Sequence, residues 1–599
     1  MAIHTLPTRN EADRATQWHL EDIYPSNEAW EAEYKKADEA IAEAGGWAGR
    51  LGESASTLLA ALLSISKVSL LVERLYVYAR MRRDEDNANT LYQGMTDRAG
   101  AISVRLGSAL AYFDPEILAI DPERLDGFFT QELALGLYRH NIDQITRRRA
   151  HTLSAAEEKL LAMAGEPLEG AQTIFTMLNN ADMKFPTIQD ENGDDVQITH
   201  GRFIPLLESR DRRVRQAAFE GLYGTYASYK NTLTATLSSN IKAEVFLARA
   251  RNFNTALDAS LHADAVPVAV YESLIGAVRA HLPTLHRYMA LRKKVLGLDE
   301  LHMYDLYVPM VADVEMPVTY GEARSLLQEG LKPLGQEYIN TLTQGLATGW
   351  VDVYENQGKT SGAYSWGVWG THPFVLLNWN DTVDNAFTLA HEMGHAMHSY
   401  LSDTHLPYEQ AQYPILLAEI ASTCNEYLFM DYMLGRTTDK RERLYLLNHF
   451  LEQIRTTVIR QVMFAEFEKI VHTMQEQGEA LTSESLCAVY RQLNVDYYGP
   501  DMVVDHEIDM EWARIPHFYG AYYVYKYATG FASAICLAEM VLHGGEAERQ
   551  RYLKLLSSGG KDYPLNLLRE AGVDLEQPDA VESCLLRFAK VIDEMEALL

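Results

Sequence analysis

Two histidines and a glutamate stand in the pattern His391-Glu392-Met393-Gly394-His395. On an α-helix, residues four apart lie one turn apart on one face, so both imidazoles can reach one metal ion. Neutral imidazole is a ligand of Zn²⁺, which favours tetrahedral coordination. Glu392 is rotated by about 100° around the helix from His391, so it flanks the ion. A carboxylate in that position can act as general base on a zinc-bound water. The pattern predicts a hydrolytic zinc site; the plain alternative is a buried histidine pair bonded to carboxylates.

A catalytic zinc site needs a third protein ligand, and the sequence offers candidates downstream. Glu419 lies in an apolar stretch of helical period, residues 415–426, where a buried carboxylate needs a partner such as a metal ion. Glu426 shares its face and is expected to fix the tautomer of a histidine ligand. His398 follows His391 by seven residues, about 10.5 Å of helix rise, too far for a third ligand on a straight helix. We expect Glu419 to be the ligand; a partly exposed helix residue is its alternative.

A tyrosine-rich segment near the C-terminus has five tyrosines and one histidine between His517 and Tyr527. Phenol and imidazole groups are the donors that an oxyanion requires during peptide hydrolysis. Four residues of the segment share helical spacing and are expected on one helix face: Tyr519, Tyr522, Tyr523 and Lys526. Core packing is the alternative for each single tyrosine, because aromatic stripes usually fill cores.

The elements that must position these residues are mainly helical, because apolar residues recur at three- and four-residue spacing. Helices are expected over residues 28–44, 54–83, 89–111, 154–163, 211–251 and 319–331. Ser154, three residues before Glu157, predicts a capping box at the start of one of them.

Two segments interrupt the helical pattern. Residues 183–199 alternate around Asn192-Gly193, which predicts a β-hairpin. We place a domain boundary beside it, between a helical N-terminal region (1–200) and a catalytic domain (201–599). Phe374 to Leu377 are expected to form a short strand that binds a peptide by accepting it as an added strand.

Composition limits the possible partners. The 599 residues carry a net charge of −30, which repels phosphate backbones and anionic membrane surfaces. No stretch reaches about 18 apolar residues without a charge, and the N-terminus lacks the apolar core of a secretory signal. The four cysteines are far apart, which suits a reducing compartment. We expect a cytoplasmic protein that binds neither nucleic acid nor membrane; the oligomeric state is left open.

Five segments together resemble one known family, the oligoendopeptidase F branch of the thimet-oligopeptidase-like (M3) zinc metallopeptidases. Three of them carry motifs: H-E-x-G-H-x-x-H at His391 to His398, E-x-x-S at Glu419 to Ser422, and H-F-Y…Y-Y-x-Y at His517 to Tyr525. The other two resemble the family's opening and closing segments, residues 18–25 and 556–564. The similarity therefore covers nearly the whole chain.

The resemblance implies a mainly α, bilobed, zincin-like metallopeptidase with a deep central channel and a small β-sheet beside the zinc site. It implies one Zn²⁺ ion with the ligands His391, His395 and Glu419. The other implied roles are Glu392 as general base, His517 and Tyr525 as transition-state contacts, and Tyr519 and Tyr522 as substrate contacts. A deep channel would admit short peptides and exclude folded proteins.

The predicted function is zinc-dependent hydrolysis of internal bonds in short oligopeptides. Glu392 would activate a zinc-bound water, and zinc with Tyr525 or His517 would stabilise the oxyanion. A helical zinc carboxypeptidase remains an alternative, because Arg514 or Lys526 could hold a free carboxylate. A peptide-binding protein without catalysis is a second alternative, against which an intact Glu392 argues.

Overall fold

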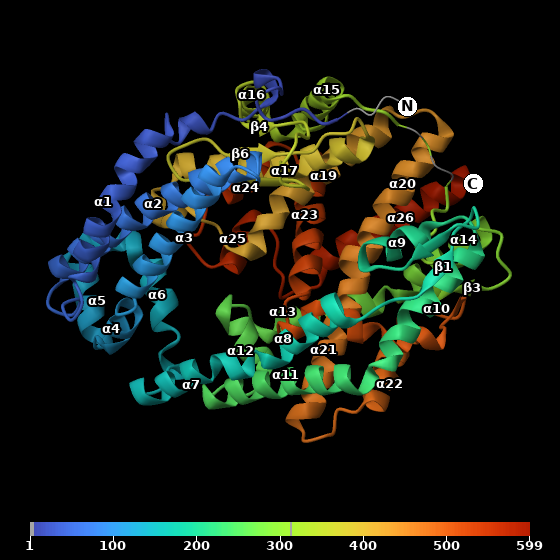
Figure 1. Ribbon diagram of the computed structural model, residues 1–599, viewed down its shortest axis with the longest axis horizontal. Helices are drawn as coiled ribbons and strands as arrows, with labels where there is room; N and C mark the ends of the chain where they lie inside the picture. The colour runs from blue at the N-terminus through green and yellow to red at the C-terminus, as the bar shows by residue number, and fades with distance from the viewer. Residues whose placement is uncertain (1–4, 312–313, 315) are drawn as a thin grey trace. The chain divides into compact units, whose positions relative to one another are not determined.

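The structure is a computed structural model that describes residues 5–311, 314 and 316–599. Helices make up most of it, and strands are short, as the sequence predicts (Figure 1). The described chain forms two compact units, each assembled from three stretches of sequence. The first unit contains Met1–Ala150, Glu315–Tyr432 and Leu537–Gly572, and the second contains His151–Val314, Met433–Cys536 and Val573–Leu599.

The first unit holds the histidine pattern. Its N-terminal helices are α1 (Asn27–Gly45), α2 (Ala55–Glu85), α3 (Thr90–Ala109), α4 (Phe113–Ala119), α5 (Pro122–Gln131) and α6 (Arg139–Thr146). Its middle stretch contains α15 (Tyr320–Gly330), α16 (Gln336–Gly345), β4 (Val351–Asp352), β5 (Tyr364–Trp366), β6 (Phe374–Leu376), α17 (Val383–His405), α18 (Tyr408–Ala411) and α19 (Ile415–Arg436). Its last stretch adds α24 (Glu546–Leu556) and α25 (Pro564–Ala571).

The second unit holds the tyrosine-rich segment. Its first stretch contains α7 (Ala155–Leu168), α8 (Gly170–Met177), β1 (Thr187–Gln189), β2 (Asp195–Gln197), α9 (His200–Glu208), α10 (Arg212–Ser228), α11 (Lys230–Ala250), α12 (Ala256–Ala263), α13 (Val268–Ala280), α14 (Leu282–Val295) and β3 (Leu301–His302). Later stretches add α20 (Lys440–Ile454), α21 (Arg460–Glu476), α22 (Ser483–Tyr498), β7 (Met502–Val503), the first part of α23 (Tyr525–His543) and α26 (Asp579–Leu598). From Leu537 on, α23 belongs to the first unit.

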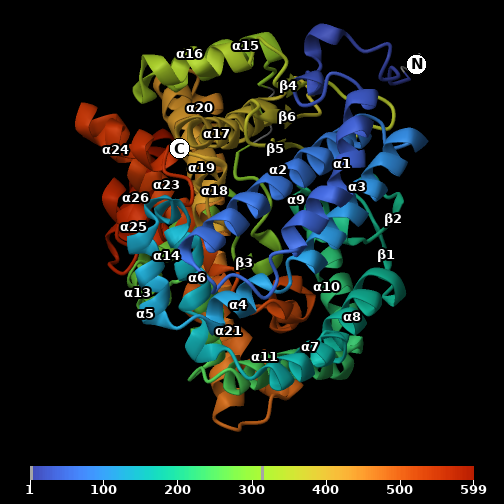
Figure 2. The ribbon, with the colours of Figure 1, turned by 90° about the vertical axis from the view of Figure 1, so that its left-hand side faces the viewer.

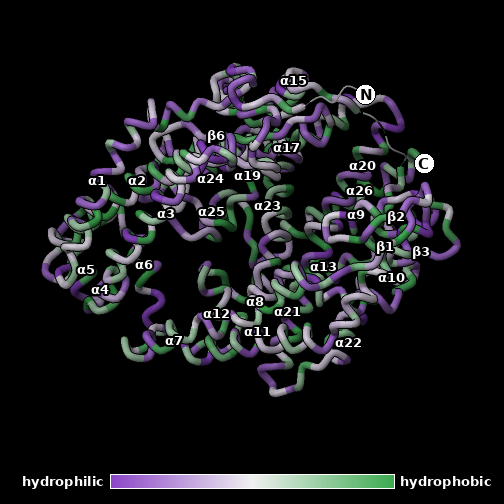
Figure 3. The backbone as a smooth tube through the Cα atoms, in the orientation of Figure 1, coloured by the Kyte–Doolittle hydropathy of each residue, from purple (hydrophilic) through white to green (hydrophobic). Residues whose placement is uncertain are grey.

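Local sequence signals account for most helix boundaries. Ser154 and Glu157 form the predicted capping box at the start of α7. The Asn27–Gly45, Ala55–Glu85 and Thr90–Ala109 helices agree with prediction to within a few residues. The single helix expected over 211–251 is wrong, because the chain leaves helical geometry at Tyr229 and forms α10 and α11. No proline or glycine marks that break. Figure 3 shows hydrophobic and hydrophilic residues alternating at short intervals along most helices.

The predicted hairpin is present as β1 and β2, which pair antiparallel with Thr187 opposite Gln197. Gly193 in the connecting loop has a φ of +86°, a conformation that glycine adopts at no steric cost. The boundary that we placed near residue 200 falls at the start of α9, inside the second unit.

A three-stranded sheet in the first unit has the order β4-β6-β5. β6 is parallel to β4 and antiparallel to β5, with Val375 opposite Val351 on one side and opposite Ser365 on the other. The expected strand at Phe374 is therefore present, but it is central. Both of its edges are already paired, so it cannot accept a peptide as an added strand, and our expectation that it would is wrong. The sheet has its free edges on β4 and β5.

The two terminal segments that resemble the family, residues 18–25 and 556–564, both pack within the first unit. His19 donates a backbone hydrogen bond to Gly349 O beside β4, at 2.8 Å. Near the other end of the chain, Gly560 N donates to Gln410 O, also at 2.8 Å. A Cβ at Gly559 or Gly560 would collide with a backbone oxygen of that same segment, so glycine is required for the close approach.

One helix of the described chain, α2, is long and apolar enough to cross a bilayer by length and hydropathy alone. α2 also packs against α1 and α3 and contributes to an apolar core with Trp18 and Trp30 (Figure 2). The bent pair α12 and α13 passes the same test only when the two helices are joined as one span.

The helix that carries the histidines, α17, begins at a polar cap and is held close to α19. The Thr382 hydroxyl accepts a hydrogen bond from Asn385 N at 3.2 Å, which satisfies a free backbone donor of the first turn. A Cβ atom at Gly394 would lie 2.6 Å from both Ala421 O and Ser422 Cα on α19. Because real Cβ contacts are longer than this, only glycine allows the two helices to lie so close. Both views place α17 and α19 side by side (Figures 1 and 2).

We predict that Gly394→Ala separates α17 from α19 and weakens metal binding. The added methyl group meets backbone atoms that cannot rotate away, so the folded state should lose about 1–3 kcal/mol. Thermal unfolding and zinc titration measure both effects. The matched control is Gly435→Ala on α19, where a Cβ meets no atom within 4 Å and should be neutral or stabilising. Unchanged stability and zinc affinity in Gly394→Ala would contradict the close-packing argument.

Candidate metal centre

Three side chains from α17 and α19 converge on one point. His391 Nε2 lies 3.2 Å from His395 Nε2, and each lies 3.5 Å from Glu419 Oε2. The histidines are one turn apart on α17, as their spacing predicts, and Glu419 reaches them from α19. These three residues form a His/Cys/Asp/Glu group close enough to share one metal ion within the described residues.

The distances among the three atoms fit a zinc ion. Ligands at 2.0–2.1 Å in a tetrahedron are separated by about 3.3–3.4 Å from one another. The observed separations of 3.2, 3.5 and 3.5 Å bracket that value. Two imidazole nitrogens and one carboxylate oxygen are also ligands that zinc accepts. The residues present therefore fit the metal that the sequence predicts.

The converging side chains are partly exposed, which leaves room for a fourth ligand. The side chains of His391, His395 and Glu419 are 30%, 17% and 48% exposed. A catalytic zinc site keeps one coordination position open for water or substrate, and this arrangement allows it. Our argument that Glu419 is a buried charge in need of a partner is wrong, although Glu419 does join the histidines.

Glu426 lies behind the first histidine. His391 Nδ1 and Glu426 Oε1 are 2.6 Å apart, which directs Nε2 of that ring toward Glu419 and His395. Burial alone would lower the pKa of His391, but Glu426 and the neighbouring carboxylates raise it to about 9 in the metal-free protein. His395, by hydrogen bonding and charge, and His391 hold the pKa of Glu419 down at about 2. In the metal-free site Glu419 is therefore negatively charged and His391 carries a proton. A metal ion must displace that proton to bind.

Glu392 follows the first histidine on α17 and is buried, with 7% exposure. Burial raises its pKa, while the charges of His391 and His395 act in the opposite direction. A general base is most effective when its pKa lies near the operating pH, so the shift favours proton transfer.

His398 lies outside the ligand group. Its ring is 1% exposed and stacks on Tyr413 with the ring centroids 3.6 Å apart. Burial and the charge of His395 lower its pKa to about 3, so it is a neutral core histidine. Neither ring nitrogen has a hydrogen-bond partner among the described residues.

The tyrosine-rich segment is not one helix. Residues Pro516–Tyr519 form a short 3-10 helix, and α23 begins only at Tyr525. Between them, Tyr522 has a φ of +56°, a left-handed conformation that ends helical geometry. The expectation of a shared helical face is therefore wrong.

The tyrosines and histidine of this segment lie in different environments. The Tyr519 hydroxyl is 2.7 Å from the Thr236 hydroxyl, and its ring stacks on Phe175. Tyr522 is buried with 2% exposure. Tyr525 is 1% exposed, and its hydroxyl has no hydrogen-bond partner among the described residues. His517 is exposed, and its Nε2 lies 3.2 Å from the Tyr527 hydroxyl.

These residues belong to the second unit, whereas the three converging side chains belong to the first. The structure therefore brings His391, His395 and Glu419 together. The approach of His517, Tyr525, Tyr519 and Tyr522 to them stays a prediction.

Two glutamates that sequence reasoning missed, one partly buried and one fully buried, hold the turn of the tyrosine-rich segment. Ala521 N donates to Glu244 Oε1 at 3.1 Å, and Tyr522 N donates to Glu468 Oε1 at 3.0 Å. His472 Nε2 lies 2.8 Å from Glu244 Oε2 and adds a second contact to that carboxylate. Burial raises the pKa of Glu468 well above its usual value. The sequence signal that could have identified Glu468 is its position as a carboxylate on the apolar face of α21.

The two cations that support the carboxypeptidase alternative are already engaged. Lys526 Nζ lies 2.6 Å from Asp264 Oδ2, and Arg514 Nε lies 3.9 Å from Glu511 Oε1. Each therefore already has a protein carboxylate as an ion-pair partner.

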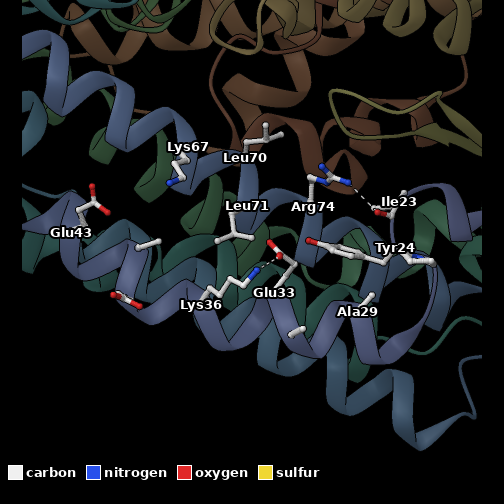
Figure 4. A pocket seen from close by; sticks show the side chains of 14 residues that line it. Ile23, Tyr24, Ala29, Glu33, Lys36, Glu43, Lys67, Leu70, Leu71 and Arg74 are labelled. Atoms are coloured by element: carbon white, nitrogen blue, oxygen red, sulfur yellow. Dashed lines mark hydrogen bonds and ion pairs between the residues drawn. The ribbon is translucent and has the colours of Figure 1, made fainter.

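A pocket of about 980 Å³ between α1 and α2 lacks the histidine and carboxylate grouping of the metal centre (Figure 4). Its lysine and glutamate side chains include an ion pair, Lys36 Nζ to Glu33 Oε1 at 2.6 Å. Arg74 donates to Ile23 O at 3.1 Å and lies over the ring of Tyr24. Its lining residues include no histidine or cysteine, and its glutamates are not among the groups of described residues close enough to share a metal ion.

The helical fold, the histidine pair with its glutamate on α17 and the carboxylate from α19 define a mainly α metallopeptidase. Residues 205–585 match the family model described as Peptidase family M3, and residues 116–185 match that described as Oligopeptidase F. The chain belongs to peptidase family M3, in its oligoendopeptidase F branch.

Relatives match over nearly their whole length. Oligopeptidase PepF of Bacillus subtilis is 48% identical over 594 residues, which are 99% of this chain and 89% of that protein. The crystal structure of oligoendopeptidase-F from Enterococcus faecium has 40% identity and a TM-score of 0.74, over 96% of this chain and 99% of that one. A solved chain from Chlamydophila abortus has 34% identity and a TM-score of 0.94, over 99% and 100%.

The predicted family, mainly α fold and enzyme class are thus confirmed: the protein is a zinc metalloendopeptidase that acts on oligopeptides. Neither the carboxypeptidase nor the binding protein is favoured.

We predict that zinc affinity rises with pH and that Glu426 sets the range. Below pH 9 a proton occupies His391 in the metal-free protein, so the apparent affinity should rise about tenfold per pH unit as one proton is displaced. Glu426→Gln removes the charge that raises this pKa, so the dependence near pH 8 should flatten. Loss of the partner should also weaken binding about 10- to 100-fold at pH 9. Competition with a fluorescent chelator at several pH values measures both; identical curves for the two proteins would contradict the role of Glu426.

Proposed function

We propose that this enzyme hydrolyses internal bonds of short peptides with a single zinc ion held by His391, His395 and Glu419, and with Glu392 as its general base. The observation that supports this most directly is the convergence of three ligand atoms within 3.5 Å of one another. Glu392 adjoins them in sequence and is buried beside their charges.

The protein residues have separate roles in the reaction. When bound, zinc supplies Lewis acidity to the water and the scissile carbonyl. The Glu392 carboxylate accepts the proton of the attacking water and then delivers it to the nitrogen of the leaving amine. Glu426 keeps the His391 ring oriented by accepting a hydrogen bond from its Nδ1–H.

Tyr525 and His517 are proposed to stabilise the oxyanion that forms during attack. The buried Tyr525 hydroxyl lacks a partner in the described part of the chain, so it is available as a donor. His517 presents an exposed ring. Tyr519 and Tyr522 stay predictions as substrate contacts, and the Tyr519 hydroxyl would have to leave Thr236 to serve as one.

The peptide backbone is proposed to pair with β5 instead of β6, because β5 has a free edge and packs against α17. Backbone hydrogen bonds along an edge strand give affinity with little dependence on sequence. A channel that admits only short, flexible peptides remains our proposal for substrate length. We also propose a cytoplasmic location and no binding of nucleic acid or membrane, on the grounds of charge and cysteine distribution.

We predict that Glu392→Gln keeps zinc and loses turnover. The amide has the same shape but cannot accept the proton, so kcat should fall by about 10³-fold. The assay is cleavage of an internally quenched peptide blocked at both ends, with zinc content measured on the same samples. The wild-type enzyme should cut inside the blocked peptide, lose activity with a chelator and regain it with zinc. Cleavage only of peptides with a free C-terminus would contradict the endopeptidase mechanism, and full turnover by Glu392→Gln would contradict its role as base.

We predict that Tyr525→Phe lowers kcat about 100-fold, because one oxyanion donor is lost. Zinc content and KM should stay close to wild type, since the ring remains packed. Tyr523→Phe is the matched control, because its side chain is exposed and two residues away. Steady-state kinetics of both variants decide the point: an unchanged kcat in Tyr525→Phe would remove this residue from the mechanism.

A further inference from the structure

A second, smaller cavity of about 240 Å³ lies in the first unit beside the C-terminal half of α17. Ser365 and Trp366 of β5 form one wall, and Ser399 and Asp403 of α17 form another. Glu73 of α2 closes a further side. None of these residues belongs to the metal centre or to the tyrosine-rich segment.

The lining combines negative charge with aromatic rings. The aromatic residues come from β5, from the loop after it, from α18 and from the chain that follows α18: Trp366, Trp369, Tyr408 and Tyr413. The two carboxyl groups of the lining are those of Glu73 and Asp403. No lysine, arginine or histidine is present among the described residues that line the cavity. Aromatic faces and carboxylates both attract organic cations.

The two carboxyl groups lack a cationic partner. The Glu73 carboxyl is hydrogen-bonded by Gln412 Nε2, at 3.1 Å from Oε1, and by the Tyr408 hydroxyl, but both of these groups are neutral. Asp403 has no ion pair within the described ranges. Burial, and then the charge of Glu73, raise the pKa of Asp403 to about 7, and burial raises that of Glu73. A bound cation would relieve both the burial cost and the mutual repulsion.

The cavity shares its helix with the metal centre. Ser399 and Asp403 follow His395 by one and two turns, so Asp403 lies about 12 Å further along α17. An extended peptide advances about 3.3 Å per residue, so this separation corresponds to three or four residues. Because β5 contributes both the cavity wall and a free sheet edge, a peptide paired with β5 would carry a side chain into the cavity.

We propose that this cavity is a specificity pocket for a lysine or arginine side chain of the peptide substrate, three or four residues from the cleaved bond. Asp403 and Glu73 bind the charge, and the aromatic rings cover the aliphatic stem. This inference rests on the proposed function and adds a preferred substrate class to it.

The test compares pairs of blocked, internally quenched peptides that differ at one position. Each pair has lysine or its uncharged analogue norleucine, placed in turn two to five residues on either side of the cleaved bond. For the wild-type enzyme, kcat/KM should favour lysine about tenfold at one position three or four residues away, mainly through KM. Elsewhere the ratio should stay near one.

Asp403→Asn and Glu73→Gln should each bring that ratio close to one and leave kcat/KM for the norleucine peptide unchanged. The two substitutions lie on different helices, and zinc content and melting temperature report whether each variant is folded. Glu409→Gln is the matched control: it removes a charge next to Tyr408 from a residue that does not line the cavity, and should keep the lysine preference.

A lysine preference lost in both cavity variants and kept in the control would support the proposal. Equal cleavage of lysine and norleucine peptides at every position would overturn it and leave the proposed peptidase function intact. A preference that survives in both Asp403→Asn and Glu73→Gln would also overturn it. Failure of the zinc-loaded enzyme to cleave any peptide would overturn both.

Discussion

The close approach of α17 to α19 at Gly394 is the constraint on which the metal centre depends. A side chain there would meet the backbone of Ala421 and Ser422 at 2.6 Å, so the helices can lie this close only across a glycine. The contact is reinforced by Asn425 Nδ2, which donates to Ala390 O at 3.3 Å. At that separation a carboxylate from α19 can reach an imidazole pair on α17. The active-site geometry is therefore set by backbone packing before any metal binds.

Charge balance gives the site its affinity for a cation. Three carboxylates act on the two imidazoles: Glu419 at ligand distance, Glu426 behind His391, and Glu392 through its charge. Without the ion, a proton on His391 offsets part of this negative charge, which is why its pKa rises to about 9. A divalent ion replaces that proton and balances the carboxylates better. The site is thus tuned by residues on both helices, and metal binding must release protons.

Sequence reasoning succeeded where the information is local. The i and i+4 histidines, the Ser154 cap and the Asn192-Gly193 hairpin each follow from neighbouring residues. It failed where residues distant in the sequence determine the local structure. Glu244 and Glu468, far from Tyr522 in the sequence, stabilise a turn that prevents the expected helix. The central place of β6 depends on two strands whose pairing no local pattern specifies. Glu419 was identified by helical period, although it is half exposed and not buried as we reasoned.

X-ray absorption at the zinc edge of the purified holoenzyme tests the central claim most directly, since it reports the ligands without depending on activity. The account predicts one zinc per chain with two imidazole nitrogens, one carboxylate oxygen and one further light atom, at about 2.0–2.2 Å. Sulfur in the coordination sphere, or a third imidazole contributed by His398, would contradict it. Either result would show that the convergence of α17 and α19 is not what holds the metal.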